Sequence, residues 1–268
     1  MTTDSWVPRG VNPAIPNVAR IYDYFLGGKD NFAADRAAAT KIAEAAPDVV
    51  RRTRENRAFL GRAVRFLAEA GVRQFLDIGT GLPTQDNVHQ VAQRLVTGAH
   101  VAYVDNDPIV LTHAWALLAT DPRTIVIEAD MREPANILRQ ASANGFIDLA
   151  QPVAILMVAV LHFLPDSERP EEIVATFREH MVPGSYLVIS HATAGDMSPQ
   201  NLTQAVQTYA TTSTGSITPR THKQIESFFD GLELQEPGVV PVALWRPAGI
   251  PPATSSGPSF LGGIARKR

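Results

Sequence analysis

One short segment constrains the fold more than any other: an apolar strand that ends in an acidic residue and continues into a glycine-containing turn. It runs from residue 74 to residue 84 and reads QFLDIGTGLPT. Gly79 and Gly81 allow the backbone to turn closely around a ligand, because neither has a Cβ atom. A dinucleotide-binding fingerprint would need a third glycine where Thr84 stands. Asp77 would repel a pyrophosphate, and it suits a cofactor with a cationic amino group.

Two further predicted strands end in the same way. Residues 100–105 read HVAYVD and residues 124–130 read TIVIEAD, so a carboxylate closes each apolar segment. In nucleoside-binding α/β folds an acid at the end of the second strand accepts hydrogen bonds from the ribose hydroxyls, and Asp105 stands at that place. Asp107, just before Pro108, is expected to cap the next helix. A nucleoside-type cofactor site is therefore predicted at the three acidic strand ends, Asp77, Asp105 and Asp130.

The segment Asp77-Ile78-Gly79-Thr80-Gly81 resembles the first motif of class I S-adenosylmethionine-dependent methyltransferases. The resemblance implies S-adenosyl-L-methionine as the cofactor. It also implies that the carboxylate of Asp130 accepts from the adenine amino group, and that the amide of Met131 donates to the ring nitrogen beside it. The residues expected to bind the cofactor from the sheet are Asp77, Gly79, Thr80, Gly81, Asp105, Asn106, Asp130, Met131 and Val158.

The N-terminal stretch from Ile15 to Arg36 carries a second and more specific resemblance. It is similar to the signature of an actinobacterial methyltransferase-like family of unassigned substrate, formerly a domain of unknown function. In class I methyltransferases the segments before the first strand fold over the cofactor. The resemblance therefore implies a helical lid at the N-terminus of this chain.

Five residues of the expected lid are candidates for the site. Gly28 and Lys29 are expected beside the cofactor, and Lys29 or Arg57 would pair with its carboxylate group. Tyr22 or Tyr24 would line the methyl-transfer cavity, and Tyr24 is a candidate catalytic residue. The alternative is that the glycine pair only ends a short helix and that the tyrosines pack against its face.

Residues 152–161 read PVAILMVAVL, and a strand this apolar must be covered on both faces. It therefore predicts a parallel sheet between two layers of helices. The next strand is expected at residues 185–191. His162 and His191 follow or end these two strands at the ligand-binding edge of the sheet, so each is a candidate catalytic base. The alternative is that each histidine is structural or merely exposed.

These patterns predict a doubly wound, Rossmann-like α/β fold: a seven-stranded, mostly parallel sheet with a terminal antiparallel strand, and an N-terminal helical lid. Residues 232–235 and 239–245 are expected to form a terminal antiparallel hairpin. The expected divisions are an arm and lid at 1–70, a methyltransferase core at 71–246 with an inserted cover helix at 198–216, and an irregular tail at 247–268, which is rich in Pro, Gly and Ser.

The composition argues against several other classes of function. The 268 residues carry a net charge of -3, so no basic field for nucleic acid is expected, and the six arginines between residues 51 and 65 are assigned to a solvated or salt-bridged face. There is no cysteine and no His-Glu-x-x-His motif, and no metal site is expected. The longest apolar run, residues 153–161, is too short to span a bilayer. We expect a cytoplasmic protein without a membrane partner. The oligomeric state stays open.

The function predicted from the sequence is direct methyl transfer from S-adenosylmethionine to an unidentified acceptor. The tyrosines of the lid and the nearly neutral surface favour a small molecule over a polymer. A non-catalytic module that binds the cofactor and regulates a partner is an alternative. A nicotinamide-dependent oxidoreductase is less favoured because of Thr84 and Asp77, and because no Tyr-x-x-x-Lys pair is present.

Overall fold

The computed structural model describes residues 11–83, 86–118, 121–249 and 259–268. Its centre is a twisted sheet with the strand order β3-β2-β1-β4-β5-β8-β6, in which β7 also pairs with β8. The first five strands run parallel to one another, and β8 is antiparallel to its neighbours. The strands are β1 (Gln74–Ile78), β2 (His100–Asp105), β3 (Thr124–Glu128), β4 (Ala154–Val158), β5 (Tyr186–Thr193), β6 (Glu233–Leu234), β7 (Val240–Pro241) and β8 (Ser259–Arg266).

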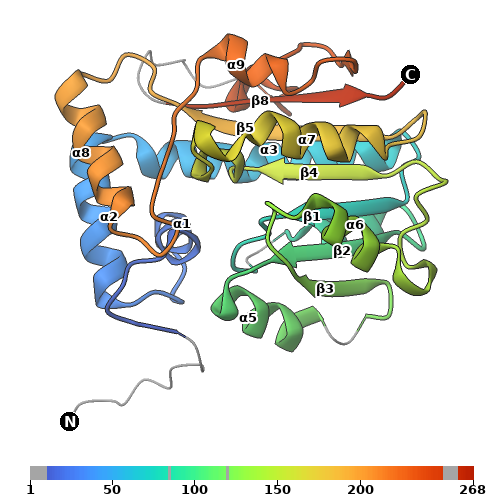
Figure 1. Cartoon of the computed structure of the whole chain (residues 1–268), viewed down its shortest axis with the longest axis horizontal. Helices are drawn as coiled ribbons and strands as arrows, with labels where there is room; N and C mark the ends of the chain where they lie inside the picture. Colours follow the sequence, from blue (N-terminus) through green and yellow to red (C-terminus); the bar gives the residue numbers. More distant parts are fainter. Residues whose placement is uncertain (1–10, 84–85, 119–120, 250–258) are drawn as a thin grey trace.

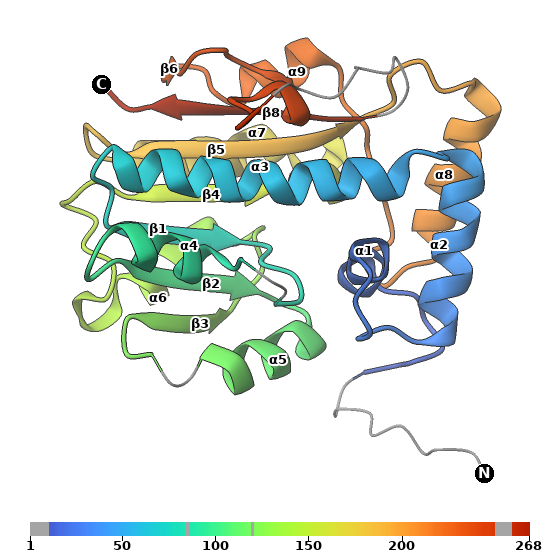
Figure 2. The same cartoon turned by 180° about the vertical axis from the view of Figure 1, so that it is seen from behind.

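Helices cover both faces of this sheet (Figures 1 and 2). One layer consists of α6 (Pro134–Ala141), α7 (Pro170–Glu179) and α9 (His222–Ser227). The opposite layer contains the long α3 (Val49–Glu69) and α4 (Val88–Leu95), with α5 (Pro108–Leu118) beside β3. The doubly wound arrangement places the carboxyl ends of all five parallel strands at the same edge.

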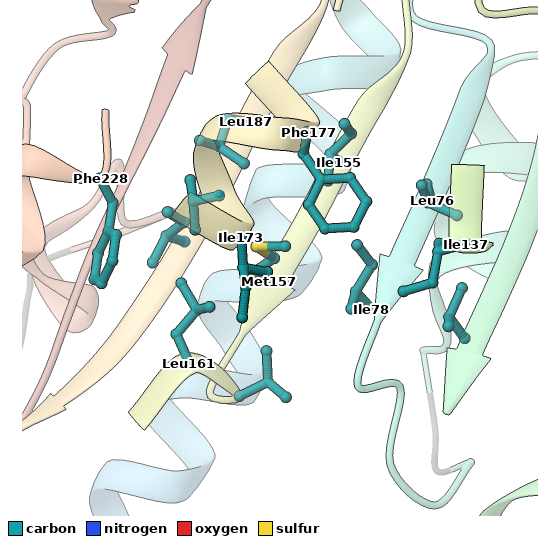
Figure 3. Packing of buried hydrophobic residues seen from close by; sticks show 14 of the residues in the cluster. Leu76, Ile78, Ile137, Ile155, Met157, Leu161, Ile173, Phe177, Leu187 and Phe228 are labelled. Atoms are coloured by element: carbon teal, nitrogen blue, oxygen red, sulfur yellow. The ribbon is translucent and has the colours of Figure 1, made fainter. Parts of the chain in front are cut away.

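The core divides into two layers because side chains alternate along each strand. In β1, Leu76 packs with Ile137 of α6 and Phe177 of α7, and Figure 3 shows this cluster. Its neighbour Phe75 points to the other face, where it packs among residues of α3 such as Phe59. All five residues of β1 are buried. The apolar strands therefore have the double coverage that their sequence predicts.

Three helices lie across the carboxyl ends of the strands, and we call them the helical cover: α1 (Val18–Leu26), α2 (Ala33–Ala45) and α8 (Pro199–Ala210) (Figures 1 and 2). α1 begins at Asn17, whose side chain accepts from the amides of Ala19 and Arg20, and it ends at Gly27 in a left-handed conformation. α2 packs against both α1 and α8. The helical cover is therefore formed by an N-terminal segment together with a segment inserted after β5.

The prediction of an irregular tail is wrong for residues 259–266, which form β8 along the whole length of β5. Gly262 and Gly263 make this strand hard to predict, because glycine is depleted in strands. Close packing nevertheless requires a residue without a side chain at position 262. A Cβ at Gly262 would lie 2.9 Å from Val242 and 3.0 Å from Phe59. Residues 250–258 of the expected tail lie outside the described residues.

The predicted terminal hairpin is also wrong in its pairing. β6 and β7 are both short, and each pairs with β8 instead of with the other. Among the described residues the sheet has eight strands and not seven. The predicted fold class, a mostly parallel Rossmann-like sheet with antiparallel strands at its C-terminal side, is confirmed. Within the described ranges, no helix combines the length and apolar character that a membrane crossing needs.

Candidate functional site

A cavity of about 500 Å³ lies where the carboxyl ends of the parallel strands meet the helical cover. The segments that follow β1, β2, β3 and β4 line it from the sheet, and side chains of α3 line one flank. α1 and α8 close it from the opposite side. The site thus lies at the edge that open α/β sheets use for ligands.

The glycine turn after β1 forms the floor of the cavity. Gly79 and Gly81 have φ angles of 70° and 66°, a region that favours glycine. A Cβ on Gly79 would lie 2.3 Å from Val160, so this glycine allows two loops to pack closely. A Cβ on Gly81 would meet no atom within 4 Å. The turn therefore leaves open space in front of Gly81, and Thr80 lines the same cavity.

Asp77 lies beside this turn with only 5% of its surface exposed. Its carboxylate has no hydrogen-bond donor among the described residues, although it lines the cavity. Burial raises its pKa to about 7, while the charge of Arg57 lowers the pKa and that of Asp105 raises it. A buried carboxylate without a donor is stabilised by a cation, and the cavity has room for one.

Asp105 is held by the backbone. Its Oδ2 accepts from the amide of Gly81 at 3.0 Å, and its Oδ1 accepts from the amide of Asp107 at 2.9 Å. Burial raises its pKa to about 6, and these amides lower it. Each oxygen keeps a further lone pair for a donor in the cavity. Asp107 caps α5 through the amide of Ile109 at 2.7 Å, as predicted.

Asp130 and Asn106 meet at the ends of β3 and β2. Asn106 Nδ2 donates to Asp130 Oδ2 at 3.0 Å. Arg132, which the sequence did not single out, also donates to both oxygens of Asp130 at 3.2 Å, and it pairs with Glu168 at 2.6 Å. A ligand amino group at Asp130 would therefore share this carboxylate with Arg132. Met131 lines the cavity beside them.

A chain of hydrogen bonds joins α1 to the end of β4. Asn56 of α3 donates to the hydroxyl of Tyr22 at 3.0 Å, and its Oδ1 accepts from Ser190 at 2.6 Å. Ser190 Oγ in turn accepts from the amide of Ala159 at 3.0 Å. Ala159, which follows Val158, has a φ of 57° and lines the cavity. Tyr22 and Val158 were predicted from the sequence, whereas Asn56 and Ser190 were not.

The other predicted residues of the lid differ in their positions relative to the cavity. Arg57 lines the cavity, and its Nη2 donates to Asn87 Oδ1 at 3.2 Å. Gly28 and Lys29 do not line it. A Cβ on Gly28 would lie 1.9 Å from the carboxylate of Asp23, so this glycine makes room inside the cover. Tyr24 is 39% exposed at the surface and does not line the cavity either.

The two candidate histidines differ in their surroundings. His162 lines the cavity and is 3% exposed, and its Nδ1 accepts from the amide of Ala192 at 3.3 Å. His191 is fully buried outside the lining. Its Nδ1 donates to the carbonyl of Ala192 at 2.8 Å, and its Nε2 accepts from Arg220 at 2.9 Å. Burial lowers the pKa of His191 to about 3. Because both of its ring nitrogens are paired inside the protein, His191 has a structural role.

The sequence predicts an inserted cover helix at 198–216, but it did not identify the residues of α8 that face the cavity. Its lining residues are Leu202, Ala205, Val206 and Tyr209. Their spacing of three and four residues is the apolar stripe of an amphipathic helix, which is a readable signal.

The arrangement fits S-adenosylmethionine. The buried carboxylate of Asp77 suits the cationic amino group, and the unused lone pairs of Asp105 suit two vicinal hydroxyls. The open space in front of Gly81 leaves room for a ligand close to the backbone of the turn. Within the described ranges, no cluster of three or more His, Asp or Glu side chains has the geometry of a metal site.

Two solved structures resemble this chain along nearly its whole length. A DUF574 family protein from Streptomyces avermitilis MA-4680 is 42% identical, with a TM-score of 0.87 over 95% of this chain and 98% of that one. A protein from Thermobifida fusca YX, provisionally assigned as a methyltransferase, is also 42% identical, with a TM-score of 0.89 over 98% and 99% of the two chains.

A more distant structure shares only the fold. It is an O-methyltransferase family protein from Burkholderia thailandensis, 14% identical, with a TM-score of 0.50 over 84% of this chain and 62% of that one. A search of curated protein sequences gave no significant match. The model of one family, described as S-adenosyl methyltransferase, matches residues 4–268. The chain therefore belongs to the S-adenosyl methyltransferase family, and its cofactor is S-adenosylmethionine.

Proposed function

We propose that this protein transfers the methyl group of S-adenosylmethionine to a small molecule bound between the sheet edge and the helical cover. The observation that carries the proposal is the continuity of the cavity. Its lining extends from the carboxylates of the strand ends to the apolar faces of α1 and α8. Cofactor and acceptor can therefore occupy one continuous cavity, and a net charge of -3 does not favour a polyanionic acceptor.

In this proposal the strand ends hold the cofactor. Asp77 pairs with its amino group, Asp105 accepts from the ribose hydroxyls, and Asp130 with Met131 contacts the adenine. Arg57 stands near Asp77 and is the candidate partner for the carboxylate of the cofactor. Lys29 is exposed and takes no part.

The bound cofactor supplies a sulfonium methyl group that a nucleophile displaces directly, so that no covalent intermediate with the protein is needed. The protein then has to align the two molecules and exclude water. The apolar stripe of α8 excludes water from the side of the acceptor. The chain from Tyr22 through Asn56 and Ser190 to Ala159 fixes the position of α1 relative to the end of β4, which is a positioning role.

The alternative of a non-catalytic cofactor-binding module makes a different structural prediction. Such a module has side chains in the place of the acceptor. Here the cavity continues from the strand ends to Leu202 and Tyr209 of α8, which favours an enzyme. Membership of the methyltransferase family gives no support to a nicotinamide-dependent oxidoreductase.

Isothermal titration tests the proposal, with S-adenosylmethionine and S-adenosylhomocysteine as ligands and with NADH and ATP as controls. We expect micromolar binding of the two sulfur compounds alone. The protein with S-adenosylmethionine is then incubated with a panel of small molecules, and mass spectrometry detects a gain of one methyl group. Binding of the sulfur compounds without methylation of any panel member, combined with tight binding to a partner protein, would favour the regulatory module.

A further inference from the structure

Four aromatic rings form one wall of the cavity, and we call them the aromatic wall: His162, Phe163, Tyr209 and Phe260. The ring of His162 lies 4.4 Å from that of Phe163 and 5.9 Å from that of Phe260. Phe163 lies 6.1 Å from Tyr209. These four residues belong to the loop after β4, to α8 and to β8. Such a wall is suited to a planar molecule, because rings prefer offset or edge-to-face contacts at these distances.

His162 presents a proton to the cavity and not a lone pair. Its Nδ1 accepts from the amide of Ala192, so the hydrogen of the neutral ring is on Nε2. Burial, together with the charges of His191 and Arg220, holds its pKa well below the usual range, and the ring stays neutral. Nε2 has no hydrogen-bond partner among the described residues. His162 is therefore a buried donor without an acceptor, and its Nε2 cannot take a proton as a neutral base would.

Tyr209, which is half-buried, supplies a second donor. Its hydroxyl has no hydrogen-bond partner within the described ranges, and Tyr209 lines the cavity. Burial raises its pKa to about 12, so the hydroxyl keeps its proton. Two neutral donors thus belong to one wall, with the ring of Phe163 packed against both.

In the part of the chain that the structure describes, no charged side chain lines this side of the cavity; Arg220 lies behind it, against His191. The lining residues between 192 and 219, together with Phe260, are either apolar or hydroxyl-bearing. The charged lining residues belong to α1, α3 and the strand ends, among them Asp23 and Arg52. A charged group bound against the aromatic wall would lose its hydration without gaining a counter-ion.

We propose that the methyl acceptor is a neutral aromatic molecule that carries a hydrogen-bond-accepting oxygen or nitrogen, which His162 and Tyr209 hold against the aromatic wall. This inference rests on the proposed function. It makes His162 a residue that orients the acceptor, in place of the base that the sequence analysis considered. The atom that receives the methyl group must then be nucleophilic in the bound molecule, because Nε2 of His162 already carries a proton and cannot remove one from it.

Four probes of similar size test the class of molecule: acetophenone, ethylbenzene, 1-phenylethylamine and benzoate. Each is titrated into the protein with and without S-adenosylhomocysteine, and ligand-observed NMR gives the affinities. We expect acetophenone to bind roughly tenfold more tightly than ethylbenzene, because only its carbonyl satisfies the buried donors. The cationic and anionic probes should bind more weakly than acetophenone. Tighter binding of either charged probe would overturn the inference.

Nitrogen NMR of histidine-labelled protein reads the proton on His162 directly. We expect the Nε2–H form for His162 and the opposite Nδ1–H form for His191, which serves as an internal reference. Acetophenone should shift the Nε2–H signal of His162 and leave the Nδ1–H signal of His191 in place. An Nδ1–H form at His162 would contradict the assignment.

Matched variants complete the test. Tyr209→Phe and His162→Phe should abolish the preference for acetophenone over ethylbenzene. Tyr24→Phe removes an exposed hydroxyl outside the cavity, and His162→Gln keeps a donor, so both should preserve the preference. Binding of S-adenosylhomocysteine is measured in every variant. If the wild-type protein binds this ligand but does not distinguish the probes, only the inference fails; if it does not bind it, the proposed function fails.

Discussion

The two sides of the cavity are built in different ways. On the sheet side, Asp105 is held by the amides of Gly81 and Asp107, so backbone geometry sets its position. On the side of the helical cover, side chains from distant segments make the connections. Asn17 donates to Asp107 and to Ser213, and Tyr22 accepts from Asn56. The sheet side is therefore a fixed receptor, whereas the position of the cover depends on a few polar contacts that single substitutions can break.

The largest expected effect follows from breaking the ion pair inside the cover. Arg20 and Asp35 lie 2.8 Å apart and are both buried. Replacing Arg20 by alanine leaves a buried carboxylate without its cation, which costs about 3–5 kcal/mol in a typical protein. We expect faster hydrogen exchange in α1 and α2 and unchanged protection in β1 and β4. Arg51→Ala, which breaks an ion pair at the surface, is the control. Equal loss of protection in the sheet would contradict the division into two sides.

The second substitution breaks the sheet side. Asp105→Ala should weaken binding of S-adenosylmethionine by about 1–3 kcal/mol, because it removes a buried acceptor for two hydroxyls. Titration calorimetry measures the change, and exchange in the cover should stay as in the wild type. Asp196→Ala, at an exposed position, controls for the loss of a negative charge. Unchanged affinity in a folded Asp105→Ala protein would refute the assignment of Asp105.

These two sides also differ in how well the sequence predicts them. Asp77 and Asp105 were identified because the carboxyl ends of strands can be read from apolar runs and glycines. The contact between Ser190 and Asn56 joins residues that are 134 positions apart, and no local pattern encodes it. Arg52 belongs to an arginine series that was assigned to a solvated or salt-bridged face. It pairs with Asp48 at 3.5 Å, but it is also 5% exposed and lines the cavity, which no local pattern indicates.

The C-terminal residues show that the fold, too, contains contacts that no local sequence pattern encodes. Gly262 and Gly263 make residues 259–266 look irregular in a sequence reading, because glycine is depleted in strands. The reason for Gly262 lies in α3 and in the segment after β7, where Phe59 and Val242 occupy the space of a side chain. The doubly wound, mostly parallel sheet with helices on both faces follows from the sequence, but this packing does not.

The third prediction concerns how the affinity for the cofactor depends on pH, and it tests Asp77 of the sheet side. In the free protein the pKa of Asp77 is raised to about 7, and the cationic amino group of the cofactor requires the carboxylate form. Affinity should therefore fall as the pH decreases below 7, by up to roughly tenfold per unit, and level off above it. Binding near pH 7 should release a proton, which calorimetry in two buffers detects. Asp77→Asn should bind more weakly and lose this dependence; a wild-type affinity that is flat between pH 5 and 8 would contradict it.

The smallest effect is expected at the link between the two sides. Tyr22→Phe removes the hydroxyl that accepts from Asn56 and donates to the carbonyl of Thr53. A hydrogen bond of this kind contributes about 1 kcal/mol. Because Asp77 and Asp105 are held without Tyr22, affinity for S-adenosylhomocysteine should change little. Exchange at the amides of α1 and of Ala159 should instead increase together, since Asn56 and Ser190 connect them. Tyr24→Phe, which removes an exposed hydroxyl from the same helix, should change neither. If Tyr22→Phe speeds exchange in α1 alone, the chain of hydrogen bonds does not couple the cover to the sheet, and the two sides are held independently.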